Sequence, residues 1–184
     1  MEKKFELTDN FVINGFGIKL FQIKCTKSFK YANEGDLGGY VEKEDNLSQY
    51  GDAWVSGNSQ VSGKAWVSGD AQVSGDAQVS GDARVSGDAW VSGNARVYGD
   101  AQVSGKARVE NNHMHCGFDC FGSCNRHTHA YKTKGNKVEI TCGCFRGSLE
   151  EFEKKVEETH KGTIYEKQYK AIINLIKIKF GIDG

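Results

Sequence analysis

Residues 51–68 read GDAWVSGNSQVSGKAWVS, and the same six-residue pattern continues without an insertion to Val109. Glycine recurs at every sixth position from Gly51 to Gly105, and valine does the same from Val55 onward. In most repeats an alanine lies two positions before the valine, so both side chains point to the same side of an extended strand. The glycine that follows, with Asp, Asn or Lys after it, favours a sharp corner. Each repeat is therefore predicted to be a short strand and a turn.

The spacing of apolar and small residues across the corners indicates a fold class. Val61 is followed four positions later by Ala65, and the pair recurs as far as Val103 and Ala107. This pattern resembles the left-handed parallel β-helix of hexapeptide-repeat proteins. The resemblance implies three repeats per turn, a triangular prism with an aliphatic interior, and outward residues that stack in columns along each wall at about 4.8 Å.

The outward columns contain the aromatic and cationic side chains of the repeat. Exposed aromatic groups on a rigid wall can form a protein-binding surface. Seven residues of the walls are therefore candidate partner-binding residues: Trp54, Trp66, Arg84, Trp90, Arg96, Tyr98 and Arg108. The alternative is that Trp and Arg stack on their column neighbours and only shield the ladder.

The segments before the repeat are expected to complete its N-terminal end. Residues 1–32 are predicted to be a β cap, because the alternating stretch 17–25 favours one or two strands that could cover an open solenoid end. The β-helix is assigned to residues 33–110, since its first part shares the turn residues of the repeat. Three apolar residues are expected to fill the interior of an irregular first coil: Leu37, Val41 and Leu47.

Residues 111–184 are expected to form a small α+β module. The stretch YKTKGNKVEI has a Gly-Asn turn and predicts a β-hairpin. Residues 148–180 predict two helices with apolar faces, which Ser148 and Thr163 cap. The predicted fold is thus mainly β: a left-handed β-helix with an N-terminal β cap and a C-terminal module of a hairpin and two helices.

Two parts of the chain resemble proteins of phages and prophages. The first is the GDLGG stretch that leads into GDA-x-V repeats. The second is a C-terminal unit with the motifs GS-x-N, T-x-x-Y, CGCF-x-G, L-x-EF and TH. In this chain those motifs fall at 122–125, 128–131, 142–147, 149–152 and 159–160. The resembled family is largely uncharacterised, so the resemblance implies a phage or prophage origin more than an activity.

Cysteine and histidine are concentrated between His113 and Cys144. Thiolates and imidazoles at this density suit tetrahedral zinc in a structural role. Six residues are candidate zinc ligands: Cys116, Cys120, Cys124, His127, Cys142 and Cys144. Their spacings, C-x3-C and C-x-C, differ from the usual C-x2-C pairs, so packed thiols are the alternative. Cys144 with His160 is also a hypothetical nucleophile pair.

Composition limits the classes of partner. The chain has 24 basic and 24 acidic residues and a net charge of zero, which argues against direct nucleic-acid binding. Apolar runs stay below transmembrane length, and the N-terminal residues lack the apolar centre of a signal peptide. The cytoplasm of a bacterial host cell is therefore the expected location.

The repeat itself offers no general base, because residues 51–109 contain neither His nor Cys. The sequence therefore favours a non-enzymatic protein that binds a host or phage protein, for example as an inhibitor of a host defence complex such as a CRISPR-type nuclease. The alternative is a degenerate hexapeptide-repeat protein of the acyl- or nucleotidyltransferase type. Flat prism walls also allow homo-oligomers. No cofactor other than structural zinc is expected.

Overall fold

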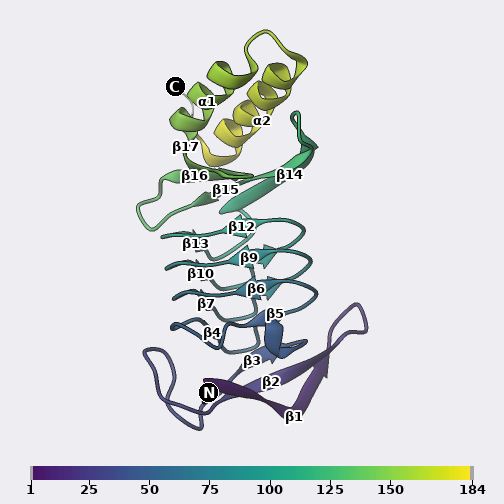
Figure 1. Ribbon diagram of the computed structural model, residues 1–184, viewed down its shortest axis with the longest axis vertical. Coiled ribbons are helices and arrows are strands. Elements are labelled where there is room, and N and C mark those ends of the chain that lie inside the picture. Colours follow the sequence, from purple (N-terminus) through teal and green to yellow (C-terminus); the bar gives the residue numbers. More distant parts are fainter. Residues whose placement is uncertain (1, 183–184) are drawn as a thin grey trace. The chain divides into compact units, whose positions relative to one another are not determined.

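The computed structural model describes residues 2–182, which divide into two compact units, the first ending at Asn111 and the second beginning at Asn112. The first unit contains an N-terminal hairpin and the repeats, and the second contains an antiparallel sheet and two helices (Figure 1). The units have separate cores. One core consists of the valines and alanines of the repeats, and the other is formed by the sheet and the helices.

Each repeat contributes one two-residue strand that ends in its valine. The strands are β4 (Trp54–Val55), β5 (Gln60–Val61), β6 (Trp66–Val67), β7 (Gln72–Val73), β8 (Gln78–Val79), β9 (Arg84–Val85), β10 (Trp90–Val91), β11 (Arg96–Val97), β12 (Gln102–Val103) and β13 (Arg108–Val109). They stack in three parallel sheets, β4-β7-β10-β13, β5-β8-β11 and β6-β9-β12. Because paired strands are three repeats apart, the predicted three-sided parallel β-helix is confirmed.

The interior of this β-solenoid is filled by the two residues that each repeat points inward. The valines from Val55 to Val109 have no exposed surface, and the alanines from Ala53 to Ala107 are at most 3% exposed. Ser59 takes one alanine position, and its buried hydroxyl donates to the backbone oxygen of Ser56 at 2.7 Å. The interior is thus apolar apart from the Ser59 hydroxyl, which is hydrogen-bonded, and this is the condition for a stable narrow core.

Three longer strands complete the N-terminal end of the solenoid. They are β1 (Phe5–Ile13), β2 (Lys19–Cys25) and β3 (Leu37–Val41). They pair antiparallel, and β3 then joins β5 in parallel, so the cap continues one wall (Figure 1). Val41 and Leu47 are buried as expected. The expectation for Leu37 is wrong: its side chain is 56% exposed, because the β2–β3 register shifts just before its pair with Lys24.

Two side chains satisfy the carbonyls that the repeat leaves open at this end. Within the coils, such carbonyls accept a backbone N–H from the preceding coil. On the β4 wall the Lys4 ammonium donates instead, to Ala53 O at 2.8 Å and Gly51 O at 3.2 Å. On the β6 wall the amide of Asn46, at the end of a 3₁₀ turn (η1, Glu44–Asn46), donates to the corresponding oxygens of residues 65 and 63 at the same distances. The open end is therefore closed by specific donors.

The second unit has a four-stranded antiparallel sheet where the sequence predicted only a hairpin. The strands, in spatial and chain order, are β14 (His115–Phe121), β15 (Arg126–Lys132), β16 (Val138–Cys142) and β17 (Phe145–Ser148). The predicted hairpin is β15–β16, with Lys132 opposite Val138. The outer strands escaped prediction because β14 lacks alternation and β17 is short.

Two helices follow this sheet, as predicted. Ser148 caps α1 (Leu149–His160) and Thr163 caps α2 (Ile164–Phe180), each by accepting the N–H three residues on. The helices pack on one face of the sheet (Figure 1). The core between them consists of Ala130, Val138, Ile140, Cys142, Leu149, Phe152, Val156, Tyr169, Ile172, Ile173 and Ile176. No helix within residues 2–182 has the length and apolar character needed to cross a bilayer.

A pair of matched glycine variants tests the stacked corners. Gly81 has φ +72°, and a Cβ there would lie 2.9 Å from the backbone nitrogen of Gly99. Gly99 has φ +66°, but its Cβ would meet nothing within 4 Å. Gly99→Ala should lower the free energy of unfolding by about 1–2 kcal/mol from left-handed strain alone. Gly81→Ala should cost more, because steric overlap adds to that strain. Equal costs in urea denaturation would contradict this account of the corners.

A second prediction concerns the buried amine of Lys4. Burial lowers its folded-state pKa from 10.5 to about 8. Between pH 8 and 10.5 the unfolded chain therefore binds more protons, so the contribution of Lys4 to stability should rise with pH. We expect the unfolding free energy of the wild type minus that of Lys4→Met to be larger at pH 10 than at pH 7. The control is Lys3→Met, which changes an exposed lysine. A difference that shrinks with pH would refute the assignment.

Candidate functional site

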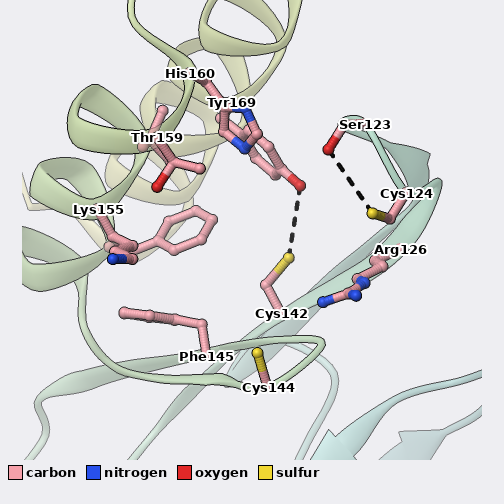
Figure 2. A pocket seen from close by; sticks show the side chains of 12 residues that line it. Ser123, Cys124, Arg126, Cys142, Cys144, Phe145, Lys155, Thr159, His160 and Tyr169 are labelled. Atoms are coloured by element: carbon pink, nitrogen blue, oxygen red, sulfur yellow. Dashed lines mark hydrogen bonds between the residues drawn. The ribbon is translucent and has the colours of Figure 1, made fainter.

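A pocket of about 260 Å³ lies in the second unit, beside the two helices and the turns at one end of the sheet (Figure 2). One side is formed by the β14–β15 and β16–β17 turns, and the other by α1 and the first turns of α2. Its lining consists of Ser123, Cys124, Arg126, Cys142, Cys144, Phe145, Phe152, Lys155, Val156, Thr159, His160 and Tyr169. Tyr169 is the part of the lining that α2 supplies.

The short C-terminal motifs of the sequence converge on this pocket. Ser123 comes from GS-x-N, Cys142, Cys144 and Phe145 from CGCF, and His160 from the TH pair. Sheet pairing brings these stretches together, because β15 lies between β14 and β16 in the sheet. The sequence showed the motifs, but it did not show that they surround one cavity.

The floor of the pocket is apolar and aromatic. Phe145 and Phe152 have ring centroids 5.1 Å apart, and Phe152 meets Tyr169 edge-on at 5.6 Å. The His160 ring stacks on Tyr169 with centroids 5.4 Å apart and 27° between the planes. Contacts of this kind hold the rings in fixed orientations. The pocket is therefore preformed by packing.

A short chain of polar groups leads from Thr128 to Tyr169 in this floor. The Thr128 hydroxyl donates to the Cys142 thiol at 3.3 Å. The Cys142 sulfur lies 3.8 Å from the Tyr169 hydroxyl (Figure 2). Burial and the neighbouring Cys142 raise the pKa of Tyr169 above its usual value. The phenol is therefore neutral at physiological pH and acts as a hydrogen-bonding group.

Two cationic side chains, Arg126 and Lys155, line the pocket. Arg126 lies across the β16–β17 turn, where a Cβ on Gly143 (φ +61°) would sit 2.2 Å from its Nη1. Within residues 2–182, Arg126 takes part in no ion pair. Lys155 has Glu158 at 3.7 Å, an exposed pair of little strength. The lining that the structure describes contains no Asp or Glu.

The six candidate zinc ligands are only partly brought together. Cys124, Cys142 and Cys144 line the pocket. Cys116 packs against the core on β14, and burial raises its thiol pKa to about 11, which disfavours the thiolate that zinc requires. Cys120 is exposed. Within residues 2–182 no group of three or more His, Cys, Asp or Glu is placed to hold a metal ion. Zinc binding stays a prediction, to be tested by metal analysis of protein purified without chelator.

His127 lies away from the pocket thiols. Alternate residues of β15 point to opposite faces, so His127 faces away from Thr128 and from the helices. Its Nδ1 is 2.5 Å from a carboxylate oxygen of Asp119, and its buried Nε2 has no hydrogen-bond partner among the described residues. A carboxylate partner of this kind orients the imidazole ring.

The hypothetical nucleophile pair shares the pocket but is not assembled. Cys144 lies at the β16–β17 turn, and His160 lies across the pocket at the end of α1 (Figure 2). No hydrogen bond joins the two side chains in the described part of the chain. The nucleophile pair therefore stays a prediction.

The predicted partner-binding residues lie on three different walls. Trp90 stacks under the Arg108 guanidinium at 4.4 Å, and its indole N–H donates to Ser74 at 3.1 Å. Trp66 pairs with Arg84 on a second wall, and both are exposed. Arg96 and Tyr98 are exposed on and beside the third. One assumption is wrong: Trp54 is not an exposed wall residue, because it is 5% exposed and Phe29 of the cap packs edge-on against it at 5.4 Å.

A surface that the sequence did not single out lies on the N-terminal hairpin. Phe11, Ile13 and Phe16, here called the hairpin patch, are 49%, 65% and 89% exposed. Beside it, a groove of about 270 Å³ lies between the hairpin loop and one solenoid wall, lined by Asn14, Gly15, Phe16, Gln60, Ser62, Gln78, Val79, Ser80 and Arg96. The signal in the sequence was the apolar pair at 11 and 13 followed by a phenylalanine between two glycines.

Comparison with known proteins supports the solenoid alone. Residues 71–87, 77–93 and 89–105 match the family model described as the YdcK beta solenoid repeat. No curated protein matches the chain. Together with the stacked strands, the match shows that this is a β-solenoid repeat protein.

Thiol reactivity tests the placement of the cysteines. Cys120, Cys124 and Cys144 are exposed and should react with iodoacetamide at pH 8. Cys116, whose thiol pKa burial raises to about 11, should stay unmodified at pH 8 and react only as the pH approaches that value. Peptide mapping by mass spectrometry measures each site. If Cys116 reacts as fast as Cys120 at pH 8, the placement of β14 against the core is wrong.

Proposed function

We propose that the chain is a non-enzymatic protein of phage or prophage origin that binds a host or phage protein. The β-solenoid serves as the rigid scaffold, and the hairpin patch with its groove is the partner surface. The observation that carries the proposal is the exposure of Phe11, Ile13 and Phe16 beside that groove. The origin rests on the resemblance of the GDLGG entry stretch and the CGCF module to phage proteins.

The composition of this surface suits a protein partner. Large exposed apolar side chains close together are a mark of interaction sites. Phe16 borders the groove, and Arg96 and Gln78 line its solenoid wall. Aromatic residues and arginine are the side chains enriched at protein interfaces. A polar wall beside an apolar edge is also the arrangement in which hydrogen bonds fix orientation while apolar burial supplies affinity.

The scaffold lowers the cost of binding. Every wall of the solenoid is held by backbone hydrogen bonds near 2.9 Å between successive coils. A surface already fixed in this way loses little conformational freedom when a partner binds. For a small phage protein, a component of a host defence complex, such as a CRISPR-type nuclease, is the partner class that we favour, because inhibition by binding requires no catalytic group.

The transferase alternative gains no support from the coils. Residues 51–109 contain no His and no Cys, and their corners carry no inserted loop in which an acid–base group could lie. Stabilisation of the chain by acyl-CoA or nucleotide-sugar donors in a thermal shift assay would reverse this preference.

Capture of partners from host lysate tests the surface with matched variants. The tagged chain should retain a specific protein whose affinity the Ile13→Ser, Phe16→Ser double variant lowers by about a hundredfold or more, since burying two large apolar side chains is worth about 3 kcal/mol or more. The control is Leu175→Ser, Ile178→Ser, which removes two similarly exposed apolar residues of α2. Both variants should keep the thermal stability of the wild type. Loss of capture in the α2 variant alone would contradict the assignment of the hairpin patch.

A further inference from the structure

The pocket of the second unit has basic side chains beside aromatic rings, and protein binding by the hairpin patch does not require them. Its lining includes the basic side chains of Arg126, Lys155 and His160, and the described part of that lining contains no carboxylate. Arg126 is the strongest of these groups because it is exposed and takes part in no ion pair within residues 2–182. A guanidinium without a carboxylate partner is suited to bidentate recognition of a phosphate or carboxylate.

The inner part of the pocket recognises a different chemistry. Phe145, Phe152 and the stacked pair of His160 and Tyr169 present ring faces and edges to the cavity. Such rings bind flat apolar groups by stacking and edge contacts. The volume of about 260 Å³ lies near the lower limit of ligand pockets, so it accommodates one ring system and not an extended cofactor.

The two chemistries lie on opposite sides of the cavity. The Arg126 guanidinium lies beside Gly143, where any side chain would collide with it. Tyr169 is fixed by the Cys142 contact at 3.8 Å below it and by the His160 ring stacked on it. Figure 2 shows Arg126 on the sheet side of the cavity and the His160–Tyr169 pair on the helix side. A ligand that satisfies both must carry its charge at one end and its ring at the other.

We propose that this pocket binds a small ligand in which an oxyanion, phosphate or carboxylate, is attached to a flat ring. The oxyanion accepts hydrogen bonds from Arg126, and the ring packs between Phe145 and the His160–Tyr169 pair. This site is independent of the partner surface on the first unit, so either proposal can fail without the other.

The thiols at the pocket report its charge directly. Cys144 is exposed within the lining, whereas Cys120 is exposed outside it. Iodoacetate and iodoacetamide modify thiols by the same reaction, but only iodoacetate carries a negative charge. The rate with iodoacetate divided by the rate with iodoacetamide should therefore be larger at Cys144 than at Cys120 in the same molecule. The quotient of these two ratios, Cys144 over Cys120, should exceed one. Arg126→Gln should bring it back toward one. Arg146→Gln removes a cation of the same module outside the lining and should leave it unchanged.

Protection of Cys144 then tests the ligand class. The probes are two matched pairs, AMP with adenosine and benzoate with benzamide, which distinguish a phosphate from a carboxylate. The anionic member of at least one pair should slow modification of Cys144 by iodoacetamide and raise the melting temperature. Arg126→Gln should weaken its binding about tenfold, as expected for loss of a charged hydrogen bond.

Three results would overturn the proposal. The first is a charge preference at Cys144 no greater than at Cys120, which would show that the pocket is not electropositive. The second is equal protection by the charged and uncharged members of each pair, which would show that no oxyanion is recognised. The third is no protection by AMP or benzoate. A wild-type melting temperature for unliganded Arg126→Gln shows that the variant folds.

Discussion

Each repeat of the first unit hydrogen-bonds to the repeat three positions further along the chain, which lies in the next coil. The rest of that unit depends on this pairing. The pairing requires every corner to have the same length and direction, because one extra residue would turn the next valine out of the core. It also leaves carbonyls open at the first coil. Lys4 and Asn46 donate to them at equivalent positions on two walls, and β3 continues the third. The regular repeat thus requires residues outside the repeat pattern to cover its first coil.

The same regularity limits where recognition can occur. Successive coils present similar side chains to solvent, so the walls offer few distinctive groups from which a specific binding site could be built. Trp90 and Arg108 are two of the larger outward residues, but they stack on each other. The distinctive surfaces lie where the repeat is absent: the hairpin patch on β1 and its loop, and the pocket of the second unit. The proposed function, binding without catalysis, assigns rigidity to the coils and recognition to these irregular parts.

The second unit is held together by contacts between distant segments and not by a short repeat. Its sheet is antiparallel, its core depends on two amphipathic helices, and its pocket is assembled from turns and helix ends that are far apart in the sequence. Gly143 illustrates the constraint. Its left-handed backbone turns β16 into β17, and the missing side chain leaves room for Arg126. The aromatic floor forms only when α1 and α2 pack on the sheet, since Phe152 and Tyr169 come from different helices.

The solenoid, the β15–β16 hairpin and both helix caps could be predicted from the sequence, because they follow from short-range periodicity and turn chemistry. The sequence also showed the motifs that carry Cys142, Cys144 and His160. The folded chain was needed to show that these residues surround one pocket, that Cys116 and His127 lie apart from it, and that Phe29 covers Trp54. The physical reason is that strand order and burial depend on contacts between distant segments, whereas a repeat of six residues carries its own contacts in its period.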